Sequence, residues 1–407
     1  MTILDQLVAR RNQAEPRLIQ RLSGRGGLVQ QPIEGVAGPR IQVRGHCILN
    51  FASANYLGLN QHPHVIKAVA KAVSTWGTSL GIPRLFATDQ LTAQLETAIA
   101  NLVGQDKALV FPSTTHIALD LLPLLAGSNG VLLLDERAYP ISVQGAAVAA
   151  QRGAHIYRFP HNDCHALTKM LQAFDATLDK VIICDGVYSS GGRPAALSEM
   201  ARLARNFDAI IYVDDAHGLG ILGQYPTAAR PYGHGGGGTA CHLAVAPGNI
   251  VYVASLSKAF GVPIAFVSGP AAFIAYLRAT AATFSNSSPP ALPMLAAALS
   301  ALQTHTICGE KLRYDLLNRV RYLRSGLAKA GARLTPNQCF PIQTVRFATP
   351  RAAEITARKL RRKGIWTVLQ FKPPDYPQGG VLRFILTAQH TEADIHRAIT
   401  NFMACSV

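Results

Sequence analysis

The sequence of 407 residues contains no uncharged apolar run of about 18 residues, the length that a membrane-spanning helix requires. Its first residues, Met1-Thr2-Ile3-Leu4-Asp5-Gln6, do not show the charged-then-apolar pattern of a secretory signal peptide. The seven cysteines are odd in number, scattered, and without CxxC spacing, which argues against a disulfide framework and against a zinc site. We therefore expect a cytoplasmic protein with free thiols, no membrane span and no structural metal.

Acidic residues are few, with 23 against 39 basic ones, so the net charge is +16. The basic residues are spread along the chain, apart from one short cluster at Arg358–Lys363, and aromatic residues do not interleave with them as a stacking platform for bases would require. The sequence therefore predicts no nucleic-acid partner. The charge suits anionic substrates instead, such as a phosphate-bearing thioester carrier.

Hydrophobic residues make up 49% of the sequence, enough for a large core, and the length indicates more than one domain. We predict an N-terminal helix and connector over residues 1–55, a large domain over 56–303 and a small domain over 304–407. Residues 1–25 have a charged helical pattern that Pro16 interrupts. The Gly233–Gly238 tract follows no strand, so we predict a flexible surface loop there rather than a phosphate cradle.

From about residue 90 the pattern alternates between helices and short apolar strands, which predicts an α/β fold with a mostly parallel sheet covered on both faces. The predicted strands span residues 108–111, 130–134, 154–159, 180–184, 209–213 and 249–254. A helix at 290–303 precedes a change of pattern. Helices at 310–331, 352–363 and 392–403, with strands at 342–347, 366–370 and 381–386, predict a smaller C-terminal α+β domain.

Polar residues follow four of the predicted strands, and ligands of such sheets bind beyond the carboxyl ends of the strands. These segments are Ser113-Thr114-Thr115, Asp185–Ser189, Asp214–Gly218 and the stretch that contains Lys258. Lys258 comes after the apolar run Ile250–Val253, so burial should lower the pKa of its ammonium group. A lysine of this kind is a good nucleophile for a carbonyl such as the aldehyde of pyridoxal 5′-phosphate (PLP).

The other parts of a PLP site are also available at these strand ends. Asp214 can face the pyridine nitrogen, and His217 can orient Asp214 or hydrogen-bond the cofactor phenolate. Ser255 and Ser257, like Thr114 and Thr115 at a helix N-terminus, can bind the phosphate. Each hydroxyl alone is better explained as a helix cap, and the Asp-x-x-His pair is explained equally well as a strand-end cap, so the prediction rests on their coincidence.

Taken together, these segments resemble the α-oxoamine synthase family of fold-type I PLP-dependent transferases. The similarity extends over most of the chain, and the most specific pieces are Asp185–Ser189, Val213–Gly218 and Leu256–Gly261, with Asn55–Leu59 at its start. The resemblance implies the following roles: Lys258 as the Schiff-base lysine, Asp214 at the pyridine nitrogen, His217 near the phenolate with Ser189 close by, Ser255 at the phosphate, and Arg383 at the amino-acid carboxylate. It also implies a homodimer with shared active sites, because Ser285 and Asn286 would reach the cofactor phosphate of the neighbouring subunit.

The resemblance further implies the reaction: an amino acid condenses with an acyl thioester, usually with decarboxylation, to give an α-aminoketone, with Lys258 carrying the proton. Four positions depart from the family pattern. Tyr139 replaces the histidine that stacks on the cofactor, and Ala54 stands where a substrate-side asparagine is usual, with Asn55 next to it as the candidate substrate ligand. Thr114-Thr115 replaces a glycine–aromatic pair, and Ile264-Ala265 replaces glycines.

The PLP-handling residues are thus present while the substrate side is altered, which favours a specialised biosynthetic enzyme. Two alternatives stay open. One is a PLP enzyme of another class, a decarboxylase, retro-aldolase or α-carbon alkylating enzyme without a thioester substrate. The other is a non-catalytic binding protein that has kept the fold, against which Lys258, Asp214, His217 and Arg383 argue.

Overall fold

A computed structural model describes residues 2–10, 18–20, 22–23, 27–335, 339–371, 373 and 376–405. The predicted break at Pro16 lies outside these residues. By their contacts, the residues form two compact units. We call Ala54–Asn318 the central unit, and Met1–Ser53 with Arg319–Val407 the terminal unit. The predicted domains, with limits at residues 55 and 303, are segments expected to fold independently. Contacts within the folded chain do not test independent folding, so these limits stay a prediction.

A seven-stranded sheet forms the middle of the central unit, in the order β4-β12-β11-β10-β7-β5-β6. Only β12 runs antiparallel to its two neighbours, and the other neighbouring pairs are parallel. This confirms the predicted mostly parallel sheet. The strands are β4 (Lys107–Phe111), β5 (Val131–Asp135), β6 (His155–Phe159), β7 (Lys180–Asp185), β10 (Ala209–Asp214), β11 (Ile250–Ser255) and β12 (Ala265–Gly269).

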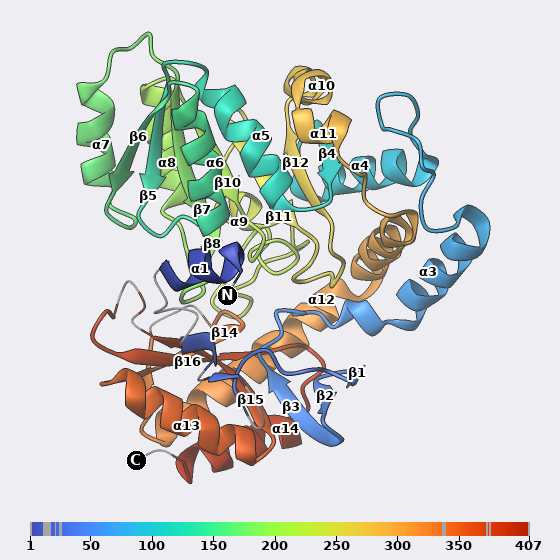
Figure 1. The fold of residues 1–407 in the computed structure, drawn as a ribbon, viewed down its shortest axis with the longest axis vertical. Coiled ribbons are helices and arrows are strands. Elements are labelled where there is room, and N and C mark those ends of the chain that lie inside the picture. The colour runs from blue at the N-terminus through green and yellow to red at the C-terminus, as the bar shows by residue number, and fades with distance from the viewer. Residues whose placement is uncertain are drawn as a thin grey trace. The chain divides into compact units, whose positions relative to one another are not determined.

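Helices surround this sheet (Figure 1). The short helices and helices of the central unit before α12 (Leu292–Lys329) are η1 (Leu59–Gln61), α3 (Pro63–Trp76), α4 (Gln90–Val103), α5 (Thr114–Ala126), α6 (Pro140–Gln151), α7 (Cys164–Ala173), α8 (Leu197–Asn206), α9 (Thr239–His242), α10 (Ala271–Thr280) and α11 (Ala282–Asn286), with the hairpin strands β8 (Val187–Tyr188) and β9 (Arg193–Pro194). Helices α5 and α6 pack against each other, and α8 packs on β10. Leu132, Ile183 and Val253 have no exposed surface, as expected for strands covered on both faces.

Helix α12 runs without a break from Leu292 to Lys329 over 38 residues. The prediction of two helices, at 290–303 and 310–331, was therefore wrong. Gly309 lies inside this helix, where it allows close packing: a Cβ added to it would lie 2.7 Å from the His305 ring. A glycine inside a helix costs about 1 kcal/mol relative to alanine, and here it leaves room for the buried His305 ring.

The terminal unit has its own seven-stranded sheet, in the order β1-β2-β3-β15-β16-β14-β13. Strands from the two ends of the chain meet where β3 pairs in parallel with β15. The elements are α1 (Ile3–Arg10), β1 (Gly35–Ala37), β2 (Arg40–Val43), β3 (His46–Phe51), β13 (Arg333–Leu334), β14 (Ile342–Phe347), α13 (Pro350–Arg362), β15 (Ile365–Phe371), β16 (Gly380–Ile385) and α14 (Glu392–Met403). Among the described helices, none has the length and apolar character that crossing a membrane requires.

Candidate active site

A cavity of about 240 Å³ lies in the central unit, where β4, β7, β10 and β11 end. Three of these strands run in parallel as direct neighbours, β11, β10 and β7, and their carboxyl ends therefore meet at one edge of the sheet. The cavity is lined by Pro112, Ser113, Thr114, Tyr139, Asp185, Asp214, Ala216, His217, Ser255, Ser257, Lys258 and Pro263. All four strand-end segments predicted from the sequence thus contribute side chains to it.

Lys258 is half-buried three residues after the end of β11. Burial lowers the pKa of its ammonium group, and the nearby charge of Asp214 partly opposes that shift. A lowered pKa leaves more of the amine neutral near physiological pH, which is the form that attacks a carbonyl. The cavity therefore brings together a nucleophilic amine, that of Lys258, and a buried carboxylate, that of Asp214.

Asp214 ends β10, is buried, and lines the cavity. Burial raises its pKa to about 6, although the Ala216 backbone N–H donates to its carboxylate at 3.2 Å and Lys258 acts in the same direction. Asp185, also buried there, has its pKa raised by burial and by the charge of Asp214. Because these two carboxylates line the same cavity, they favour binding of a cationic group in it.

The neighbouring Asp215 points away from the cavity lining into a dense network. Its carboxylate accepts hydrogen bonds from the Thr239 backbone N–H at 2.6 Å, the Thr239 hydroxyl at 2.7 Å and the Tyr252 hydroxyl at 2.7 Å. Burial still raises its pKa to about 6. This network ties the segment after β10 to β11 and to the start of α9.

The glycine tract at Gly233–Gly238 closes over that network, which corrects the prediction of a flexible surface loop. Gly236, Gly237 and Gly238 are buried. A Cβ added to Gly238, whose φ is +95°, would lie 2.0 Å from the Tyr252 hydroxyl and 2.5 Å from Asp215 Oδ2. The glycines are therefore required for close packing, and low complexity in the sequence was a misleading sign of flexibility.

His217 is fixed by a residue that sequence reasoning did not assign. The hydroxyl of the fully buried Tyr56 lies 2.7 Å from Nδ1 of His217. The two residues are 161 positions apart, so no local spacing could reveal the pair. Tyr56 belongs to the Asn55–Leu59 segment that carries part of the family resemblance, which was the one available signal.

Tyr139 stands at the cavity as the N-cap of α6, and its side chain is 40% exposed. Its backbone N–H donates to Asp185 Oδ1 at 2.9 Å. Because Asp185 lies at the end of β7 between the ends of β5 and β10 in the sheet order, this bond sets the position of the Tyr139 backbone beside the cavity. Asp185 itself was missing from the predicted site residues.

Hydroxyl and backbone donors gather around another part of the lining. Ser113 and Thr114 stand where α5 begins after β4, and the Ser113 side chain does not cap the helix but bonds His116 Nδ1 at 2.8 Å. Ser255 Oγ lies 2.8 Å from Ser257 Oγ. Backbone N–H groups in the first turn of a 13-residue helix, with hydroxyls nearby, favour an anion such as a phosphate.

Six predicted site residues lie outside the cavity lining. Thr115 is in the first turn of α5, Ser189 is in the turn after β8, and Ser285 and Asn286 end α11. Asn55 packs against the lysine stretch, since a Cβ added to Gly261 would lie 2.9 Å from its Oδ1.

Arg383 is on β16 of the terminal unit, where its guanidinium donates to Gln370 Oε1. The roles of all these residues stay predictions.

Comparison with known proteins places these features in context. Residues 47–402 match the family model of the class I and II aminotransferases. The chain is 35% identical over 373 residues to an 8-amino-7-oxononanoate synthase of Dechloromonas aromatica (strain RCB), covering 90% of this chain and 92% of the relative. It is 32% identical over 400 residues to the 8-amino-7-oxononanoate synthase of Aromatoleum aromaticum, covering 97% of each.

Among solved structures, a serine palmitoyltransferase of Sphingomonas wittichii is similar with a TM-score of 0.88 and 24% identity, covering 100% of this chain and 98% of that one. A serine palmitoyltransferase solved with PLP has a TM-score of 0.87 at 24% identity, with the same coverage. At this level of identity the structural likeness establishes the fold, and the more similar sequences establish the family.

Proposed function

The chain belongs to the class I and II aminotransferase family and, within it, to the α-oxoamine synthases, and from this premise we propose that it joins an amino acid to an acyl thioester, with loss of the carboxylate, to give an α-aminoketone. It is a PLP-dependent acyltransferase with the fold-type I architecture. The observation that carries the proposal is the single cavity in which Lys258, Asp214 and His217 meet serine and threonine hydroxyls.

The cavity residues fit PLP by their chemistry. The carboxylate of Asp214, whose pKa burial raises to about 6, gains a partner in a protonated ring nitrogen. Lys258 is the residue for covalent attachment, Tyr139 for contact with the ring, and Ser255, Thr114 and Thr115 for the phosphate. When bound, PLP supplies an aldehyde that captures amines and a ring that takes up the charge of a carbanion.

The protein side chains then bind, orient and move protons. The amine of Lys258, with its pKa lowered by burial, takes a proton from the amino-acid Cα and returns it. His217, held by Tyr56 at 2.7 Å, keeps its ring in one orientation at the cavity wall. Arg383 binds the amino-acid carboxylate, because a guanidinium fork matches the two oxygens.

Tyr139 and Ala54 define how this enzyme departs from the family pattern. A phenol can lie against a ring, but unlike histidine it cannot become a cation or donate from a ring nitrogen. Ala54 offers no side-chain hydrogen bond where an amide is usual. We therefore propose a substrate pair from specialised biosynthesis, with the acyl group carried on CoA or on a carrier protein.

We also propose a cytoplasmic homodimer with shared active sites, in which Ser285 and Asn286 reach the phosphate held by the partner subunit.

The deciding experiment mixes the PLP-loaded enzyme with each of the common amino acids and either acyl-CoA or acyl-carrier protein. Release of free thiol, measured with a colorimetric thiol reagent, should depend on both substrates and be accompanied by CO₂. The variant Lys258→Ala provides the inactive control. If an amino acid is consumed or decarboxylated at the same rate without a thioester, and no thiol appears, the enzyme belongs to another class of PLP reaction.

A further inference from the structure

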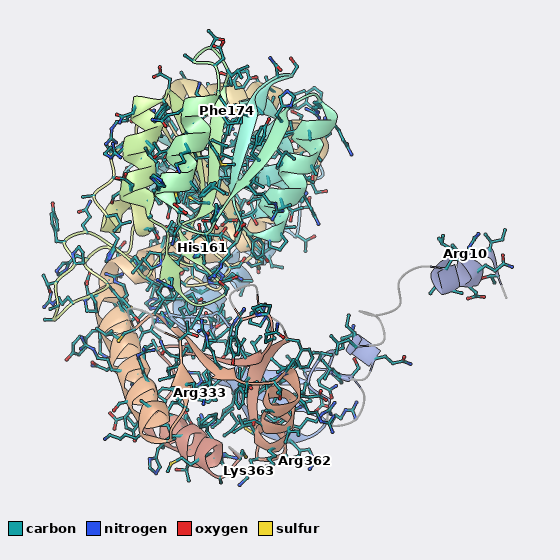
Figure 2. All side chains as sticks on the ribbon, turned by 90° about the vertical axis from the view of Figure 1, so that its left-hand side faces the viewer. Arg10, His161, Phe174, Arg333, Arg362 and Lys363 are labelled. Carbon is teal, nitrogen blue, oxygen red and sulfur yellow. The ribbon has the colours of Figure 1, made fainter. Side chains whose placement is uncertain are left out.

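A second hollow, of about 820 Å³, lies wholly within the terminal unit. It is bordered by the turn between β2 and β3, the turn between α13 and β15, and one side of α14. Its charged lining residues are Arg44, His46, Arg361, Arg362, Lys363 and Arg397, while Val43 and Ile48 contribute buried apolar surface. Figure 2 labels Arg362 and Lys363 at the end of α13.

The lining carries five permanently cationic side chains and no carboxylate. Within the described part of the chain, none of the five forms an ion pair, and Arg397 instead donates to the Lys363 backbone carbonyl at 3.0 Å. The arginines around the hollow behave differently. Arg358 on α13 pairs with Glu354 at 3.0 Å, and Arg40 on β2 pairs with Asp394. The lack of counter-charges is therefore a feature of the hollow rather than of the whole unit.

Arg361 makes this arrangement unusual, because it is only 9% exposed. Its guanidinium lies over the ring of Trp366, 4.7 Å from the centroid, and its Nε has no hydrogen-bond partner. Burial, with a smaller contribution from Arg44, lowers its pKa. A buried cation is costly unless an anion or hydrogen bonds offset the loss of water, and the described residues provide no such anion.

We propose that this hollow binds a small molecule that carries two or more phosphate groups. Several cations around one open hollow match a multivalent anion, and guanidinium groups bind phosphate oxygens in pairs. Val43 and Ile48 form a packed apolar floor beneath these cations, against which Trp366 lies. Nucleoside triphosphates and CoA share this chemistry, and inorganic pyrophosphate carries its charged part alone.

The two tryptophans of the chain allow a local measurement. In the variant Trp76→Phe, the remaining fluorescence comes from Trp366, which is in contact with Arg361. We expect ATP, CoA or pyrophosphate, added to the PLP-loaded protein at constant ionic strength, to change this fluorescence saturably. The reciprocal variant, Trp366→Phe, reports from Trp76 on α3 and should show no change. A flat titration of the Trp76→Phe protein by all three ligands would overturn the proposal.

A charge-matched pair of triple variants, each made in the Trp76→Phe background, tests the cations. The first combines Arg44→Gln, Arg362→Gln and Lys363→Gln. The control combines Arg152→Gln, Lys169→Gln and Arg205→Gln, which remove the same charge from exposed positions of the central unit. We expect Kd to rise at least about tenfold in the first and to change less than about twofold in the control, since the first variant removes three of the five cations that would contact phosphate oxygens.

The ligand panel separates the possible sources of phosphate. Tighter binding of ATP than of CoA identifies a nucleotide site, the reverse order identifies a CoA site, and equal binding of pyrophosphate shows that the charged groups suffice. Citrate is the control anion, and citrate binding as tightly as ATP would refute phosphate selectivity. Duplex DNA or an acidic protein displacing ATP at lower concentrations would show that the hollow serves a macromolecule and would also refute the proposal.

Discussion

Lys258 is the residue on which the proposed chemistry depends, because it is the lysine that lines the cavity at the strand ends. Borohydride reduction of the PLP-loaded enzyme should add the mass of the cofactor to the peptide that contains Lys258. The variant Lys258→Ala should gain no such mass, whereas Lys169→Ala, at an exposed position, should behave like the wild type. Mass spectrometry of the reduced and digested protein gives the answer. Labelling that persists at another lysine in Lys258→Ala would disprove the assignment.

Asp214 should make the stability of the PLP-free protein depend on pH. Burial raises its pKa from 3.8 to about 6 in the folded state, so its contribution is fully present below about pH 4 and is lost as the pH rises through 6. A shift of two pKa units corresponds to about 3 kcal/mol. We therefore expect Asp214→Asn without PLP to be more stable than the wild type at pH 7.5 and equally stable at pH 4, by urea unfolding.

Asp215 titrates in both proteins, and Asp185 acts in the same direction as Asp214, because loss of the Asp214 charge removes one cause of its raised pKa and so also stabilises the variant at pH 7.5. Adding PLP should reverse the order at pH 7.5, because a cationic ring nitrogen stabilises the carboxylate and not the amide. An Asn variant that is less stable than the PLP-free wild type at pH 7.5 would contradict the explanation by burial.

Tyr56 is predicted to position His217. The variant Tyr56→Phe removes the 2.7 Å hydrogen bond to Nδ1 while keeping the buried ring. A hydrogen bond of this kind contributes about 1 kcal/mol, so kcat/KM should fall about threefold to tenfold. Tyr225→Phe, at a side chain that is 78% exposed, is the control and should leave kcat/KM unchanged. Equal activity of the two variants would show that His217 is oriented by other contacts.

These residues show how far the sequence could predict the site. Lys258, Asp214 and His217 follow strands that are recognisable as short apolar runs, so the rule for strand ends brought them together correctly in one cavity. Tyr56 was beyond such reasoning, since it reaches His217 across 161 positions. Asp185 was quoted within a motif but not assigned, because only the fold reveals that it bonds Tyr139.

In the Gly233–Gly238 tract before α9, replacing a glycine by alanine should destabilise the protein strongly only where the glycine is closely packed. Gly238→Ala places a Cβ 2.0 Å from the Tyr252 hydroxyl, so we expect a loss of about 3 kcal/mol in the free energy of unfolding, or failure to fold. Gly235→Ala is the matched control: its φ is also positive, at +79°, but a Cβ meets nothing within 4 Å. It should cost about 1 kcal/mol, the strain of the backbone alone. Similar urea midpoints for the two variants would show that the tract tolerates side chains.

Two other elements show why local patterns were insufficient. Strand β12 was not predicted, because Ala265–Gly269 is only five residues long and follows the lysine stretch without a helix between them. It is specified by pairing with β4 and β11 on both sides. In α12, His305 is buried against Phe260, with ring centroids 5.1 Å apart, and bonds Arg313 at 2.7 Å. These contacts favour an unbroken helix across Gly309, where the sequence alone favoured an interruption.

The molecule as a whole joins its first and last segments in one unit, as the pairing of β3 with β15 requires. Order along the sequence therefore could not predict which segments pack together. In the proposed dimer, residues of two chains also come together, since Ser285 and Asn286 are assigned to the site of the other subunit. Both residues stand at the end of α11 and outside the cavity lining of their own chain.

Hybrid dimers provide the test of shared sites. Neither Lys258→Ala nor the double variant Ser285→Ala/Asn286→Ala should be active alone. In a hybrid, one site carries both defects and the other carries neither, because each chain contributes to both sites of a two-fold dimer. Random mixing gives hybrids in half of the dimers, so co-refolding should restore about a quarter of wild-type activity. Thiol release after mixing measures it.

The control mixes Lys258→Ala with Asp214→Asn, two changes in the same cavity of one chain. If sites are shared in the way proposed, that mixture should regain no activity beyond its residual level, because every site then contains a chain with a defective cavity. Recovery by the control to the same extent as the first mixture, or no recovery by the first mixture in dimers verified by sedimentation, would rule out a contribution of Ser285 and Asn286 across the interface.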